Sequence, residues 1–209
     1  MEEQYKILLM GPQGSGKGTQ GALLSKELSI PVFGTGQLIR EEIASGSEFG
    51  KKLHELVLAG DLVSDVDAAE LLKRRLAKSD THNGYLLDGY PRNLGQMEKF
   101  TFDKPTHVIV IEIPKEESLR RLGGRLTCQP CDNITSTMLE VKAGDPCPCG
   151  GVWYQREDDT PEAIEHRLNI YEHDTAPVIA EYEKLDIVRR VNGVGTIEEV
   201  HDRIKQLLG

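Results

Sequence analysis

The stretch "ILLMGPQGSGKGTQ" (residues 7–20) places a glycine-rich turn directly after a short apolar run. From Gly11 it reads G-x-x-x-x-G-K, the spacing of a phosphate-binding loop, in which backbone N–H groups and a helix N-terminus face one anion. The next residue is Gly18, where such loops usually have the Ser or Thr that ligates magnesium. We therefore expect a strand, a phosphate-binding turn and a helix, with the metal held by groups elsewhere.

Apolar runs alternate with helical patterns along most of the chain. Residues 107–113, "HVIVIEI", are rich in Val and Ile without polar alternation, which indicates a strand buried on both faces of a parallel sheet. We expect further strands at 5–10, 31–33, within 84–92 and at 186–191, and helices at 17–28, 36–45, 48–59, 65–78, 115–122 and 196–208. Another helix should begin at Thr160-Pro161-Glu162 and break or kink at Pro177. This order predicts a doubly wound α/β fold around a parallel sheet.

The composition is that of a globular protein with an acidic balance. Of the 209 residues, 38% are hydrophobic and 28% are charged, and the formal net charge is −9. This length suffices for one main domain with a substantial core. The negative charge argues against broad binding to nucleic acid or to an anionic membrane, and no segment approaches the roughly 18 apolar residues that span a bilayer. We expect a cytoplasmic protein, in which any site for a polyanion is locally rich in Arg and Lys.

All four cysteines lie in one short segment. Cys128-x-x-Cys131 and Cys147-x-Cys149 fall within residues 126–155, which show no helical period and are too many for a plain loop. The first pair has the spacing of a zinc knuckle. We expect an inserted subdomain with a structural Zn²⁺ on Cys128, Cys131, Cys147 and Cys149, because four protein ligands leave no open position for catalysis. Unbound thiols or another soft metal are the alternatives.

Several segments in one fixed order resemble adenylate kinases. They are "GPQGSGKGTQ" (11–20), "GTGQLIR" (34–40), "GDLVSD" (60–65), "LLDGYPRNLGQ" (86–96), "RLGGRL" (121–126) and "YQREDD" (154–159). Together they cover nearly the whole chain. The resemblance implies a P-loop NTP hydrolase-like fold and a reversible, Mg²⁺-dependent transfer of a phosphoryl group from ATP to AMP, giving two ADP. In this family the metal is carried mainly by the nucleotide phosphates and by waters, so Gly18 does not disqualify the loop.

The resemblance also implies roles for residues at matching positions. The catalytic set is Lys17, Asp88, Arg92, Arg125, Arg156 and Arg167. The ATP-binding set is Gly14, Ser15, Gly16, Lys17, Gly18, Thr19, Arg121, Arg125 and Gly195. The AMP-binding set is Thr35, Arg40, Asp61, Leu62, Val63, Gly89, Tyr90, Pro91, Arg92, Gln96, Arg156 and Arg167. The expected division of the single domain, 1–209, is a core (1–33, 64–125 and 157–209), an AMP-binding helical segment (34–63) and a lid (126–156).

Some alternatives stay open at this stage. The rival assignment is another nucleoside monophosphate kinase, with a UMP or CMP acceptor or a GTP donor. Gly34 and Gln37 replace the Ser and Asp that the family usually has in the 34–40 segment, which bears on the acceptor, and Asn133-Ile134-Thr135 lacks the family's usual aromatic, which bears on the donor base. Asp158 and Asp159 form either lid-closing contacts or a solvated acidic turn. A zinc-ribbon protein that binds nucleic acid is disfavoured by the charge of −9. The expected partners are ATP and AMP or ADP, with no nucleic acid and no membrane, and the expected state is a monomer.

Overall fold

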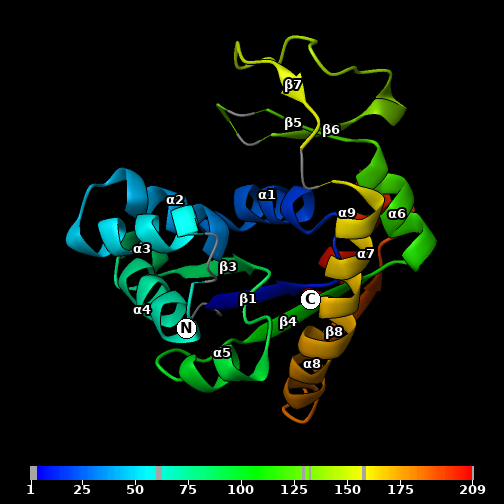
Figure 1. Cartoon of the computed structure of the whole chain (residues 1–209). Coiled ribbons are helices and arrows are strands. Elements are labelled where there is room, and N and C mark those ends of the chain that lie inside the picture. Colours follow the sequence, from blue (N-terminus) through cyan, green and yellow to red (C-terminus); the bar gives the residue numbers. More distant parts are fainter. Residues whose placement is uncertain (1–3, 60–62, 129, 132, 157–158, 209) are drawn as a thin grey trace.

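The computed structural model describes residues 4–59, 63–128, 130–131, 133–156 and 159–208. Its centre is a parallel sheet in the order β2-β3-β1-β4-β8. The strands are β1 (Tyr5–Met10), β2 (Val32–Gly34), β3 (Gly84–Asp88), β4 (His107–Glu112) and β8 (Val188–Asn192). The predicted doubly wound α/β fold is confirmed, and β1, which leads into the glycine loop, lies in the middle of the sheet (Figure 1).

Helices cover both faces of this sheet. The alternating side chains of β1 divide between two cores: Ile7 and Leu9 pack with α1 (Lys17–Leu28) and α9 (Ile197–Leu208). Leu8 and Met10 pack on the other face, with α4 (Asp65–Leu76) and α8 (Ala176–Glu183). In Figure 1, α1 lies above the sheet, and α5 (Leu94–Lys99) and α8 lie below it. Because β1 and β4 are buried on both faces, their apolar runs lack polar alternation.

Two parts project from the sheet. Helices α2 (Thr35–Ala44) and α3 (Glu48–Ala59) form an arm on one side of the molecule (Figure 1). A separate antiparallel sheet, in the order β6-β5-β7, stands above the core and consists of β5 (Arg125–Cys128), β6 (Ile134–Ser136) and β7 (Trp153–Tyr154). One 3₁₀ turn, Thr137–Leu139, follows β6. The sequence predicted an inserted segment here but not these strands.

The region around Pro177 differs from its prediction. Thr160 caps α7 (Pro161–Ile170) as expected, because its side chain accepts a hydrogen bond from the Ala163 N–H. The chain then widens into a π-helical turn, Tyr171–Thr175, and continues as α8, with Pro177 in the first turn of α8. Proline has no N–H to donate to the preceding helical turn, and a wide turn accommodates that loss. The predicted break at Pro177 is therefore a π turn just before it.

The remaining elements are α6 (Lys115–Gly123) and a 3₁₀ turn, Ser79–Thr81. Helix α5 was not predicted; its N-cap is Asn93, whose side chain accepts the Gln96 N–H at 2.7 Å. Among the described residues, no helix combines the length and apolar character that crossing a membrane requires.

The start of the glycine loop yields the first testable prediction. Gly11 has φ +141°, and a Cβ there would lie 2.3 Å from the Ile111 carbonyl oxygen of β4. Gly11→Ala should therefore lower the free energy of unfolding by about 2 kcal/mol or more, measured by chemical denaturation. The matched control is Gly123→Ala, because a Cβ there would meet no atom of the described residues within 4 Å beyond its chain neighbours and its own helix's backbone. Equal stabilities of the two variants would contradict this packing.

Candidate active site

The glycine loop joins the end of β1 to the start of α1. Gly14 and Gly16 have φ +83° and +92°, the left-handed region that favours glycine. Gly16 is the N-cap of α1, and no side chain caps the helix there. Ser15 is buried, whereas Gly18 and Thr19 are exposed on the first turn of α1. This geometry leaves a helix N-terminus and a curved backbone facing one point, which is the arrangement that binds phosphate.

Lys17 lies over this loop and has unusual electrostatics. Its Nζ donates to the carbonyl oxygens of Gly11 at 2.8 Å and Pro12 at 2.9 Å. Burial lowers the pKa of Lys17 to about 8, Asp88 acts in the opposite direction, and the charges of Arg92 and Arg125 lower it further. The structure thus brings these four charged groups together.

The acid Asp88 lies beside the glycine at position 18. Asp88 is the last residue of β3, and a Cβ on Gly18 would lie 3.6 Å from its Oδ2. The carboxylate therefore lies beside the position where the usual Ser or Thr side chain would be. Gly34, the last residue of β2, is similarly close: a Cβ there would be 3.0 Å from the Asp88 carbonyl oxygen. A Cβ at position 34 would be tight against Asp88, whereas one at position 18 would make only an ordinary van der Waals contact with it.

One buried carboxylate joins two of the predicted arginines. Asp159, whose side chain is 0% exposed, accepts from Arg125 Nε at 2.8 Å and Nη2 at 2.5 Å, and from Arg167 Nη2 at 2.9 Å. Arg125 begins β5 and Arg167 lies on α7, so this carboxylate ties the small sheet to the core. The solvated-turn alternative is wrong for Asp159, while Asp158 lies outside the described residues.

Arg92 is fixed by its own loop and by the π turn before α8. Its Nε donates to the Gly89 carbonyl oxygen at 2.8 Å, and its backbone N–H donates to Gln96 Oε1 at 2.8 Å. Its carbonyl oxygen accepts from Thr175 Oγ1 at 2.8 Å. Tyr90 and Pro91, which precede it, are buried. An exposed arginine that is held in this way can present its guanidinium at a defined place.

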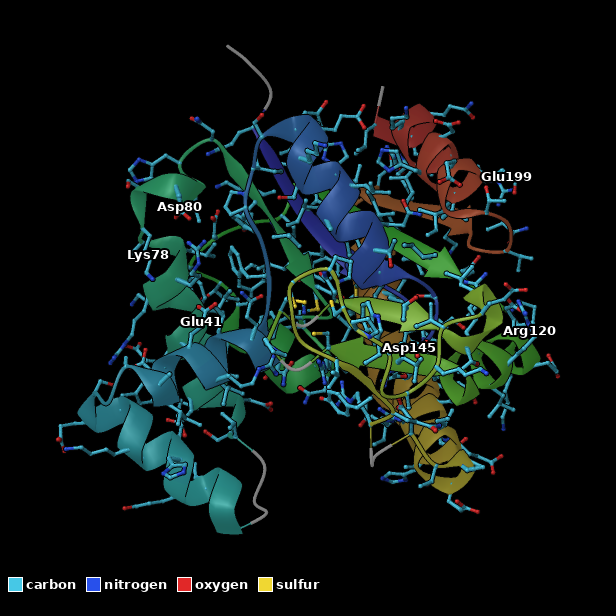
Figure 2. All side chains as sticks on the ribbon, turned by 90° about the horizontal axis from the view of Figure 1, so that it is seen from above. Glu41, Lys78, Asp80, Arg120, Asp145 and Glu199 are labelled. Atoms are coloured by element: carbon cyan, nitrogen blue, oxygen red, sulfur yellow. The ribbon has the colours of Figure 1, made fainter. Side chains whose placement is uncertain are left out.

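Arg121 connects the glycine loop to the segment between β8 and α9. Its Nη1 donates to the Gly14 carbonyl oxygen at 3.3 Å, and its Nη2 donates to the Gly193 carbonyl oxygen at 3.0 Å. Glu117 holds its Nε at 2.6 Å, and hydrogen bonds from Arg120 and Arg121 lower the pKa of Glu117 to about 2. Arg120 itself lies at the outer surface (Figure 2). Gly195, predicted to bind ATP, lies in the same segment as Gly193 and has φ +136°.

The other predicted residues lie on α2, after β7 and near α4, or fall outside the described residues. Thr35 begins α2 and is half-buried, and Arg40 is exposed on the same helix. Arg156 is exposed after β7, and the half-buried Val63 packs against the core near α4. Gln37 is exposed, and its Nε2 donates to Glu41 Oε1 at 2.7 Å. Asp61 and Leu62 lie outside the described residues.

The four cysteines converge in the small sheet. Their Sγ atoms all lie within 4.8 Å of one another, with Cys128 to Cys149 at 3.4 Å and Cys131 to Cys147 at 3.7 Å. A tetrahedral site with Zn–S bonds of about 2.3 Å has S···S separations of about 3.8 Å, so the set fits zinc. A Cβ on Gly151 would lie 2.7 Å from Cys128 Sγ, which shows why glycine occurs there. The Gly151 N–H bond to Cys149, with the neighbouring thiols, lowers the pKa of Cys149 to about 7, whereas burial raises the pKa of Cys128 to about 12.

Comparison with known proteins identifies the family. The family model described as adenylate kinase matches residues 9–187. The chain belongs to the adenylate kinase family. It is 37% identical to the adenylate kinase of Methanothrix thermoacetophila, with 97% of each chain covered. It is 38% identical to that of Syntrophobacter fumaroxidans, covering 97% of this chain and 99% of the relative, and 39% identical to that of Xanthomonas campestris, covering 98% and 99%.

This membership confirms the predicted enzyme class, a nucleoside monophosphate kinase, and excludes the zinc-ribbon alternative. The sequence missed two features of this adenylate kinase site. Thr175, whose partner Arg92 is 83 positions away, gave no local signal. Gly193 was not predicted, although it lies in the same glycine-containing turn as Gly195.

The lowered pKa of Lys17 predicts proton uptake when ATP binds. In the free enzyme about half of the Lys17 side chains are neutral near pH 8. A neighbouring triphosphate favours the charged ammonium and raises this pKa, so binding should take up a fraction of a proton at pH 8.3 and almost none at pH 6.5. Calorimetry of Mg·ATP binding in two buffers of different ionisation enthalpy measures this uptake.

The control for that experiment is Lys17→Arg, which stays charged at both pH values and should show no uptake if it binds. Identical binding heats in the two buffers at pH 8.3 for the unaltered enzyme would mean that Lys17 is already charged or lies away from the phosphates.

Proposed function

We propose that this chain catalyses reversible phosphoryl transfer from ATP to AMP, giving two ADP. The observation that carries this proposal is the gathering of Lys17, Asp88, Arg92 and Arg125, with Arg167 joined through Asp159, beside the glycine loop. Two nucleotide polyanions must meet in line, and catalysis depends mainly on positioning and on stabilising their charge. Several fixed cations around one point are suited to that task.

The donor would lie on the loop side of this cluster. Gly14, Ser15, Gly16, Gly18 and Thr19 would surround the ATP phosphates, with the Lys17 ammonium at the outer phosphates. Arg121 would border the donor adenine, because it spans the glycine loop and the turn that contains Gly195. Its planar guanidinium is held by three partners and offers a flat face to a base.

The acceptor would lie between the arm and the loop after β3. Arg92 and Arg40 would bind the AMP phosphate, and Thr35, Gln96 and the segment Asp61 to Val63 would contact the nucleoside. Gly89, Tyr90 and Pro91 would shape the wall beside it. The bond from the Arg92 N–H to Gln96 Oε1 orients the amide, which can then both donate to and accept from an adenine edge.

Arg125, Arg156 and Arg167 would surround the transferred phosphoryl group. In the structure, the Asp159 carboxylate forms ion pairs with the guanidinium groups of Arg125 and Arg167. A phosphoryl group carries more negative charge and more acceptor oxygens, so it can compete with this carboxylate for the same donors. Asp159 would thus keep the two arginines in place between turnovers.

The site also fits a magnesium ion carried on ATP. Asp88 offers a carboxylate beside Gly18 and the loop, suited to waters around a hard cation. When bound, the metal neutralises phosphate charge. Asp88 would orient its water shell and, through its own charge, keep Lys17 protonated.

We further propose that Cys128, Cys131, Cys147 and Cys149 hold one structural zinc that stabilises the lid, residues 126–156. The other two parts would be the core (1–33, 64–125 and 157–209) and the AMP-binding helical segment (34–63). The enzyme would act in the cytoplasm as a monomer, without nucleic acid or membrane partners.

A panel of acceptors tests the proposed reaction. ADP formation from Mg·ATP should be fastest with AMP and slower by about 100-fold or more with UMP, CMP or GMP, because polar groups that pair with adenine are left unpaired by other bases. Replacing ATP by GTP in the same assay tests the donor. Faster turnover with UMP or CMP would overturn the adenylate assignment and leave the phosphoryl-transfer class intact.

Elemental analysis and a melting experiment test the zinc site. We expect one zinc per chain. A chelator should shift the fluorescence transition of Trp153, the only tryptophan, to lower temperature, since this residue packs against Cys128 and Cys147. The far-UV circular dichroism transition of the core should move less, because the metal would staple a subdomain too small to sustain its own core. Metal-free protein with four titratable thiols and an unchanged Trp153 transition would refute the zinc proposal.

A further inference from the structure

The helix that carries Arg167 contains an irregularity near the acceptor side of the site. Helix α7 ends at Ile170, the π turn covers Tyr171–Thr175, and α8 begins at Ala176. A π turn changes the direction in which the following side chains point, and such turns are frequent at functional sites. Thr175 is the last residue of this turn and is 8% exposed.

The hydroxyl of Thr175 leaves its own helix for a distant partner. A helical Thr commonly bonds to a carbonyl of the preceding turn. Thr175 Oγ1 instead donates to the carbonyl oxygen of Arg92 at 2.8 Å, 83 positions away in the chain. Helix α8 packs on the same side, where Val178 and Ile179 share a core with Tyr90. The hydroxyl therefore makes a polar contact beside the apolar packing of α8 on the loop after β3.

This bond completes the fixation of Arg92. The Arg92 N–H is bound by Gln96 Oε1, its Nε by the Gly89 carbonyl oxygen, and its C=O by Thr175. Gly89 and Gln96 belong to the same short loop and α5, so their bonds shape that segment locally. The bond from Thr175 links this segment to the π turn that follows α7, the helix that carries Arg167.

We propose that Thr175 is a positioning residue, which sets the place of Arg92 relative to Arg167. The two arginines lie on opposite sides of the proposed reaction, with Arg92 at the acceptor phosphate and Arg167 at the transferred group. A small displacement of one against the other disturbs in-line approach of the nucleotides. This inference rests on the proposed function, because it assigns Arg92 to the acceptor phosphate.

Two substitutions isolate the hydroxyl from the packing. Thr175→Val keeps the shape and removes the donor, whereas Thr175→Ser keeps the donor. We expect kcat/KM for AMP to fall about tenfold in the Val variant, with KM for ATP within about twofold of the parent enzyme. The Ser variant should recover most of the loss.

Binding measurements separate the phosphate from the base. In Thr175→Val, affinity for AMP should fall, whereas affinity for adenosine, which lacks the phosphate that Arg92 would hold, should stay the same. If the parent enzyme prefers UMP or CMP, the proposed function fails, and the same comparison is made with that acceptor and its nucleoside. The two failures are thus distinguishable.

Thr81 supplies a matched control. It is 5% exposed and its Oγ1 donates to the carbonyl oxygens of Leu76 and Lys78, so Thr81→Val removes a comparable buried hydroxyl elsewhere in the fold. It should lower the melting temperature without a selective effect on AMP. The inference is overturned if Thr175→Val behaves like this control, if it weakens adenosine and AMP equally, or if Thr175→Ser does not recover the acceptor kinetics.

Discussion

Repulsion between like charges is the constraint on which this site depends. The charges of Arg92 and Arg125 lie near enough to Lys17 to lower its pKa. Arg167 is joined to Arg125 through the carboxylate of Asp159. Asp88 and Asp159 offset these charges from within the cluster. Gathering buried charges costs free energy unless partners or a ligand compensate it, so such a cluster points to an anionic ligand. The acids that make the net charge −9 lie largely elsewhere, and Figure 2 shows Asp80 and Glu199 at the periphery.

The fold brings these charges to one place through backbone geometry. The glycine loop follows β1 and Asp88 ends β3, its direct neighbour, so both lie at the carboxyl edge of the sheet, where ligands of such folds bind. Arg125 lies on the small antiparallel sheet instead. It begins β5, the strand that ends at Cys128, so a metal on the cysteines would also fix the strand that presents this arginine. Asp159 then ties that strand to α7, and Thr175 ties the continuation of the same helix to Arg92.

The sequence predicted the elements whose signals are local. The run of β4, the glycine turn before α1 and the Thr160 cap of α7 depend on neighbouring residues, and the structure has them. Strands β6 and β7 are only three and two residues long and are defined by pairing with β5, so no period could reveal them. For Asp159 the sequence left lid-closing contacts and a solvated acidic turn open, because its partner Arg125 is 34 positions away. The residue roles came from family resemblance, and the pairings of Asp159 and Thr175 came from the folded chain.

The most direct test of this account is a crystal structure of the enzyme with Mg²⁺ and a compound in which two adenosines are joined by five phosphates. Such a ligand spans donor and acceptor positions at once. We expect Lys17, Arg92, Arg125 and Arg167 each to bind phosphate oxygens at about 3 Å, with Asp159 giving up at least one of its bonds to the two arginines. Phosphates bound elsewhere, with the Arg125–Asp159–Arg167 contacts unchanged and Lys17 still on the Gly11 and Pro12 carbonyl oxygens, would contradict it.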